Sequence, residues 1–201
     1  AGAVAVTTLK EEYFVRKSVS IEEGLHALRT TVTTSIEYGV KNRRVRFIMC
    51  LVFAINLSLM APNMYWQPYF KVWLGSQTSL GFLFVGIMLS MMAGSWVTGK
   101  VHTLLSERYA LCISSVLIGF GILVAATVPY FGIALTAFYL HEIARGAFTP
   151  LKDAYLHEMI PSKERATIVS FESIAHHIGG AIGLVASGVL AALLSISVAW
   201  T

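Results

Sequence analysis

The chain has 201 residues, of which 56 % are hydrophobic and 13 % are charged, and its formal net charge is +4. Soluble domains average about 45–50 % apolar and about 25 % charged residues, so this composition argues against a water-soluble globule. The basic residues are confined to particular loops, so the positive charge is explained by the orientation of the chain in a membrane. It gives no reason to expect nucleic-acid binding. The partner that the composition predicts is a lipid bilayer.

Five continuous apolar stretches follow one another, each long enough to supply the roughly 20 helical residues that cross a hydrocarbon layer of about 30 Å. They cover approximately residues 47–68, 79–99, 109–128, 130–158 and 166–194. Runs that are continuous rather than alternating exclude a β-barrel and leave helices as the spanning elements. The sequence therefore predicts an all-α fold, a polytopic transmembrane helical bundle.

Alternate loops carry almost all the lysine and arginine. Basic residues precede the first span and follow the second and the fourth, at Lys10, Arg16, Lys17, Arg29, Lys41, Arg43, Arg44, Arg46, Lys100, Arg108, Lys152, Lys163 and Arg165. The loops on the other side carry only Lys71. Because basic residues accumulate in short cytoplasmic loops, we expect the first span to run from the inside to the outside.

The two ends of the chain are predicted to be parts of further helices. Residues 1–9 are expected to end a preceding transmembrane helix, and residues 198–201 to open a last helix that is truncated. Residues 10–46 are expected to form a cytoplasmic linker, in which Ser20 and Glu23 make a capping box. Apolar residues at helical spacing then predict an amphipathic helix: Ile21, Leu25, Leu28, Val32 and Ile36.

One stretch is motif-like, running from Arg145 to Ser170 as RGAFTPLKDAYLHEMIPSKERATIVS. It holds a glycine, a proline four residues on, and then a loop with proline, an acidic residue and Arg-Ala, at Gly146, Pro150, Pro161, Glu164, Arg165 and Ala166. With the linker and the series of spans, it resembles the C-terminal half of a major facilitator superfamily transporter. The resemblance implies that residues 47–201 are that half and that an N-terminal half of the same transporter is missing.

The resemblance also implies a cytoplasmic gate loop, formed by Gly99, Arg108, Pro161, Glu164 and Arg165. In the family, the loop between the second and third helices of a half often reads Gly-x-x-x-Asp-Arg-x-Gly-Arg-Arg. Here Gly99 and Arg108 match, whereas Thr103 stands where the acidic residue would be. This departure weakens the gate assignment more than the family assignment.

Charged and imidazole groups at membrane depth are the candidates for chemistry, because they are costly in lipid and persist mainly with a partner or a purpose. On the fourth span, His141, Glu142 and Arg145 occupy neighbouring helical positions. An ion pair of Glu142 with Arg145 would neutralise both, and its separation would allow Glu142 to take up a proton. Proton or substrate handling and a permanent structural ion pair both fit this spacing.

On the fifth span, Glu172 and His176 are four residues apart and share a face. Histidine titrates near neutrality and suits a proton relay, so a role in proton coupling and a hydrogen-bonded contact between helices are both open. His177 points about 100° away from His176 around the helix.

In the resembled family, the first and fourth helices of each half line the central cavity. Asn56, Asn63 and Gln67 are therefore candidates to hydrogen-bond a substrate, with Tyr65 or Trp66 stacking on it. An interfacial aromatic belt is the alternative for Tyr65 and Trp66.

Small residues recur every fourth position on two spans, which permits close helix packing. They are Gly86, Ser90, Gly94 and Thr98, and Ala175, Gly179, Gly183, Ser187 and Ala191. The resemblance suggests the sliding interface between two halves, and static packing inside one bundle is the alternative.

The resemblance implies secondary active transport of a small organic solute by alternating access in the cell membrane. Coupling to protons is a hypothesis that rests on His141, Glu142, Arg145, Glu172 and His176. The solute is left open between a lipophilic drug, which Met60, Met64, Met88, Met91 and Met92 would suit, and a polar metabolite such as a sugar. No Walker motif or Cys/His metal spacing occurs, so no cofactor or metal is predicted.

Two other classes are weighed against transport. One is a transporter-like receptor or scaffold. The other is a membrane-embedded di-iron enzyme, suggested by Glu172 and His176-His177 together with His141 and His157, although six scattered histidines make a poor ligand set.

Overall fold

The computed structural model describes residues 22–23, 25, 29–30, 33, 41–160 and 165–201. Within these ranges the chain is helical and contains no strand, which confirms the all-α prediction for the described part. The helices from residue 43 onward are α3 (Arg43–Leu74), α4 (Gln77–Leu104), α5 (Glu107–Thr127), α6 (Phe131–Met159), α7 (Arg165–Leu193) and the short α8 (Ile196–Trp200). The expectations for residues 1–9, for most of the linker at 10–46 and for Pro161 and Glu164 lie outside the described residues.

Local sequence explains where the helices start and stop. The side-chain oxygen of Asn42 accepts the backbone N–H of Arg44 at 3.0 Å, so α3 begins directly after this cap. α3 ends at Gly75, whose φ of 67° a residue with a Cβ rarely adopts. Ser76 then caps α4 by accepting the backbone N–H of Ser79 at 3.1 Å. Two consecutive long helices are thereby joined by a two-residue turn.

Among the residues that the structure describes, four helices are long and apolar enough to cross a membrane, namely α3, α4, α5 and α7. α6 has 29 residues, but His141, Glu142 and Arg145 lie near its middle and lower its hydropathy. His141 and Glu142 are only 1 % and 2 % exposed, so these groups face protein and not lipid. The fourth predicted span, at 130–158, therefore depends on burial by neighbouring helices, which sequence hydropathy does not measure.

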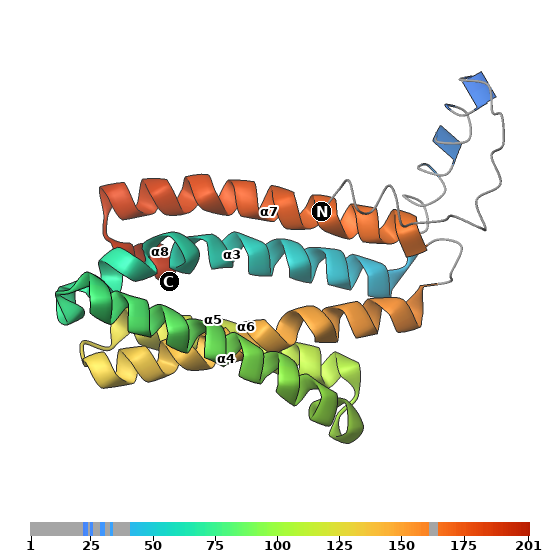
Figure 1. The fold of residues 1–201 in the computed structure, drawn as a ribbon. Coiled ribbons are helices and arrows are strands. Elements are labelled where there is room, and N and C mark those ends of the chain that lie inside the picture. The colour runs from blue at the N-terminus through green and yellow to red at the C-terminus, as the bar shows by residue number, and fades with distance from the viewer. Residues whose placement is uncertain (1–21, 24, 26–28, 31–32, 34–40, 161–164) are drawn as a thin grey trace, which may run out of the picture.

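The bundle has two parts (Figure 1). α7 lies along α3, while α6 packs against both α4 and α5. Large apolar side chains cover the outside of this arrangement, including Phe82, Val116 and Val185, which are 74 %, 69 % and 66 % exposed. Such a surface would drive association in water, and a lipid environment accommodates it.

Two apolar clusters, one toward each end of the bundle, extend to its middle, where polar groups also lie. One cluster contains Val45, Ile48 and Ile168 near the start of α3, and the other contains Phe70 and Trp200 near its end. Arg145 is the central residue of α6, and Asn56 and Asn63 lie close to the middle of α3. The polar side chains are therefore at mid-depth.

The small-residue stripes are packing surfaces inside this chain. A Cβ on Gly179 or Gly183 would collide with the carbonyl oxygens of Phe53 or Leu57, and one on Gly94 with that of Ile143. α7 is thus pressed against α3, and α4 against α6. The interpretation of these stripes as the interface between two halves is wrong for these glycines, because neighbouring helices of the same bundle already cover them.

Candidate functional site

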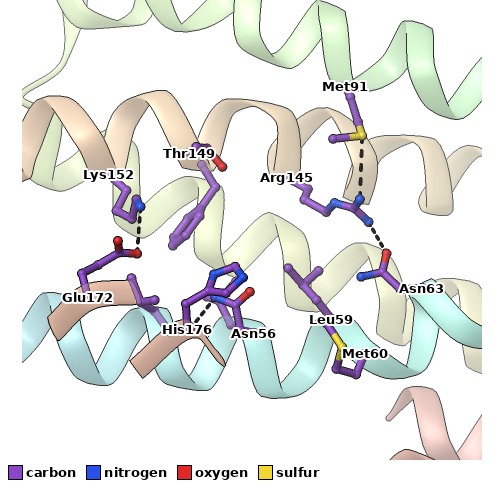
Figure 2. A pocket seen from close by; sticks show the side chains of 13 residues that line it. Asn56, Leu59, Met60, Asn63, Met91, Arg145, Thr149, Lys152, Glu172 and His176 are labelled. Carbon is purple, nitrogen blue, oxygen red and sulfur yellow. Dashed lines mark hydrogen bonds and ion pairs between the residues drawn. The ribbon is translucent and has the colours of Figure 1, made fainter. Parts of the chain in front are cut away.

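A cavity of about 350 Å³ lies between α3, α6 and α7, with Met91 of α4 at one edge (Figure 2). We call it the central pocket. Its lining residues are Val52, Ile55, Asn56, Leu59, Met60, Asn63, Met91, Arg145, Phe148, Thr149, Lys152, Glu172 and His176. Apolar walls with a few convergent polar groups are typical of small-molecule sites.

Arg145 has partners on three helices. Its Nη1 donates to Oδ1 of Asn63 on α3 at 2.7 Å and to Oε1 of Glu142 on its own helix at 3.3 Å. Its Nη2 lies 3.8 Å from the sulfur of Met91 on α4. The planar guanidinium reaches several directions at once, so Arg145 ties the polar centre together.

Glu142 supports Arg145 from behind the pocket. Its side chain is 3 % exposed, whereas that of Arg145 is 23 % exposed, and Glu142 is not among the lining residues. Its second oxygen, Oε2, is buried without a hydrogen-bond partner among the residues that the structure describes. The pair is thus unequal, with the cation facing the pocket and the carboxylate in the protein interior.

A second ion pair crosses the pocket from α6 to α7. Nζ of Lys152 donates to Oε1 of Glu172 at 2.8 Å, and both side chains are nearly buried. Asp153 also contacts Nζ, at 3.0 Å, but it is 52 % exposed and does not line the pocket. A buried ion pair between two helices is costly to break by removing one partner, so this pair fixes α7 relative to α6.

The structure brings some of the sequence-predicted residues together at this pocket. They are Asn56, Asn63, Arg145, Glu172 and His176. The four-residue spacing of Glu172 and His176 does place both on the pocket face of α7. The amide nitrogen of Asn56 donates to the carbonyl oxygen of Val52 at 2.8 Å, which leaves its oxygen at the pocket.

His141 is directed elsewhere. Its ring is stacked on Phe138 at 5.8 Å, and its Nδ1 lies 2.8 Å from the carbonyl oxygen of Ile118 on α5. One helical position separates it from Glu142, which is enough to turn it toward α5. His141 therefore does not line the pocket with the other candidates for proton coupling.

The aromatic candidates also lie apart from the central pocket. Trp66 stacks on Phe84 of α4 at 5.9 Å, and Trp66 and Gln67 line a separate hollow with residues of α4. Tyr65 packs against the apolar cluster at that end of the bundle. The structure thus separates Tyr65, Trp66 and Gln67 from Asn63. Trp66 and Gln67 lie about one turn further along α3, beside residues of α4, and Tyr65 packs against the apolar cluster.

The sequence model of the Major Facilitator Superfamily matches residues 46–201. The chain belongs to the major facilitator superfamily. No curated protein and no solved structure shows significant similarity to it. Members of this superfamily are membrane transporters and not enzymes, so the chain is part of a multi-pass membrane transport protein. Among the described residues, no group of three or more His, Cys, Asp or Glu side chains is placed to hold a metal ion.

Two polar pocket residues of this superfamily member, Lys152 and Thr149, are not among the binding or coupling candidates predicted from the sequence. The basic charge of Lys152 suggests a position on the cytoplasmic side. In the structure, Lys152 lies within α6, which continues to Met159, and it lines the pocket. The available signal is its spacing, since residues seven positions apart share a helical face and Arg145 is seven before it. Thr149 lies between them on the same side.

The described residues of the expected gate loop do not form one cluster. α4 continues to Leu104, so Gly99 is helical and lies before the turn instead of within it. Arg165 begins α7 and donates to the carbonyl oxygen of His157 at 3.4 Å. Arg108 lines a separate cavity at the same end of the bundle.

Proposed function

We propose that this superfamily member carries out secondary active transport of a small organic solute by alternating access, coupled to protons. The observation that carries the proposal is the Lys152–Glu172 ion pair, which joins α6 to α7 at 2.8 Å and lines the central pocket. Charges at membrane depth are rare and usually serve a pathway or a proton relay. The Lys152–Glu172 pair lines the pocket and also joins two helices, so a change in its charge would affect both the pocket and the contact between the helices.

Coupling follows from competition for Glu172. While Lys152 neutralises it, the carboxylate stays ionised and α6 and α7 are held together. A proton on Glu172 removes its charge, which releases Lys152 and loosens α7. His176, one turn further on α7 and also at the pocket, is placed to pass protons to Glu172.

The remaining polar groups fit solute binding. Arg145 and Asn63 are joined by a 2.7 Å hydrogen bond at the pocket wall, and a solute acceptor or donor can exchange with either. Apolar surface comes from Leu59, Met60 and Phe148. Of the methionines considered for a lipophilic solute, only Met60 and Met91 line the pocket, while Met64, Met88 and Met92 are exposed.

Alternating access requires a partner surface. Transporters of this kind bind solute near the midplane between two repeats, and we propose that an N-terminal half of the same transporter closes the central pocket. We further propose that the protein acts in the cell membrane with its 10–46 linker on the cytoplasmic side. The excess of lysine and arginine before the first span supports that orientation.

The test is uptake by the full-length protein in vesicles with an imposed pH gradient. A panel of lipophilic drugs and sugars is screened with the wild type, and the compound that accumulates is then used for the variants. Glu172→Gln is expected to abolish gradient-driven accumulation while solute exchange without a gradient continues, because the amide cannot carry the coupled proton. Glu142→Gln is expected to reduce both, because Arg145 loses its buried counter-charge.

Asp153→Asn is the matched control. This carboxylate also contacts Lys152, at 3.0 Å, but lies outside the pocket, so its neutralisation is expected to leave both activities in place. If Glu172→Gln keeps wild-type accumulation under the gradient, the coupling assignment is wrong. If wild-type vesicles move no member of the panel, a receptor or scaffold role replaces transport.

A further inference from the structure

A second cavity, of about 820 Å³, is lined by residues near the starts of α3 and α5 and the end of α6. It is lined by Arg43, Arg44, Phe47, Arg108, Tyr155 and Glu158, and we call it the arginine cavity. Among the lining residues that the structure describes, three arginines stand against one glutamate, a formal charge of +2. The central pocket lies about halfway along the same helices, so the two sites are separate.

The surrounding backbone adds to this positive charge. Arg43, Arg44 and Arg108 stand in the first turns of α3 and α5. The N-terminal end of a helix carries a partial positive charge, and it favours anions over cations. Glu158 in the wall and Glu107 in the first turn of α5 offset part of this charge, and a bound anion would offset more of it. Phosphate is the anion whose geometry guanidinium groups match best.

The cavity also has an apolar side. Phe47 lines it about one turn further into the membrane-spanning part of α3 and is 36 % exposed. Near the cavity, the turn between α4 and α5 presents Leu104, Leu105 and Tyr109, which are 81 %, 42 % and 68 % exposed. A free anion would use only the arginines. A phospholipid would use the arginines for its headgroup and this apolar surface for its chains.

We propose that the arginine cavity binds the phosphodiester headgroup of an anionic phospholipid, with Arg43, Arg44 and Arg108 as donors. Basic pockets between transmembrane helices at the cytoplasmic face suit such headgroups. A bound lipid joins the starts of α3 and α5 to the end of α6. It thereby stabilises this end of the bundle.

The test measures lipid binding by the full-length protein in a neutral detergent. Three additions are compared by the midpoint of thermal unfolding: dioleoyl-phosphatidylglycerol, dioleoyl-phosphatidylcholine and sodium phosphate. Mass spectrometry then measures the phosphatidylglycerol retained after purification. The double variant Arg44→Gln/Arg108→Gln is compared with Arg46→Gln, which removes an exposed arginine of the same turn of α3 that does not line the cavity.

Phosphatidylglycerol is expected to raise the unfolding midpoint of the wild type and of Arg46→Gln by several degrees, as a ligand of the folded state does. The double variant should lose this shift and retain several-fold less lipid. Should it fail to fold, the single variants Arg44→Gln and Arg108→Gln are each compared with Arg46→Gln. An equal shift with sodium phosphate, an equal shift with phosphatidylcholine, or an unchanged response of the arginine variants would each overturn the proposal.

Discussion

Arg145 occupies the centre of the polar network, and its side-chain shape matters as much as its charge. It reaches Asn63, Glu142 and Met91, which come from three helices, with two nitrogens of one planar group. A lysine at this position would keep the charge but offer a single point of donation. Asn63 is the partner at the shortest distance, 2.7 Å. The interaction energy between the side chains of Asn63 and Arg145 is therefore the quantity to measure at the scale of single residues.

A double-mutant cycle of Asn63→Ala with Arg145→Lys is expected to show a coupling energy of about 1.5–3 kcal/mol, the range for hydrogen bonds to charged groups. The free energy of unfolding in mixed micelles with increasing denaturing detergent is the readout. The control cycle replaces Asn63→Ala by Asn56→Ala, because the Asn56 amide donates to its own helix at Val52. Equal coupling in both cycles would contradict a specific bond between Asn63 and Arg145.

Between elements, the decisive contact is the glycine-mediated approach of α7 to α3. Gly179 and Gly183 sit directly over the carbonyl oxygens of Phe53 and Leu57, so no side chain separates the two backbones. Membrane helices lack a hydrophobic drive toward one another and associate through such close packing. The same contact brings Glu172 and His176 of α7 to the central pocket.

Gly179→Val is expected to lower the free energy of unfolding by about 1–3 kcal/mol, the usual cost of overpacking. The control is Gly188→Val on the same helix, where an added Cβ would meet no atom within 4 Å. Both substitutions carry the same change in helix propensity, so the difference between them isolates the packing cost. Equal destabilisation of the two variants would contradict the α3–α7 contact.

At the scale of the whole molecule, the helix order fixes which turns share a side of the membrane. The turn between α4 and α5 contains Ser106, and the turn between α5 and α6 contains Tyr130. One helix separates them, so the two turns belong on opposite sides. Because basic residues accumulate in short cytoplasmic loops, we propose that the Ser106 side is the cytoplasmic one.

Single cysteines at Ser106→Cys and Tyr130→Cys test this topology, in a background where Cys50 and Cys112 are changed to alanine. Neither native side chain makes a capping hydrogen bond, so helix starts are unaffected. A membrane-impermeant maleimide added to intact cells is expected to label Tyr130→Cys alone, and both positions after permeabilisation. Labelling of Ser106→Cys in intact cells would reverse the assigned orientation.

The sequence by itself determined the helical class, the approximate spans and the family, because these follow from local properties. Hydropathy, caps and turn residues act within a few positions, as at Asn42 and Gly75. It also placed Glu142 beside Arg145 and Glu172 beside His176, since both spacings stay on one helix. α6 marks the limit of this reasoning, because its central charges depress hydropathy and only neighbouring helices make it a buried span.

Only the tertiary structure decided which helix faces meet. Three contacts illustrate this: Lys152 with Glu172, Arg145 with Asn63, and His141 with the carbonyl oxygen of Ile118. Each joins residues that are 20 to 82 positions apart in the sequence. The glycine stripes also depend on the tertiary structure. Their spacing predicts close packing but does not identify the helix that packs against them. In lipid, contacts between helices depend on shape and on a few polar bonds. The residue pattern along one helix shows which face can make a contact, but it does not identify the helix on the other side of that contact.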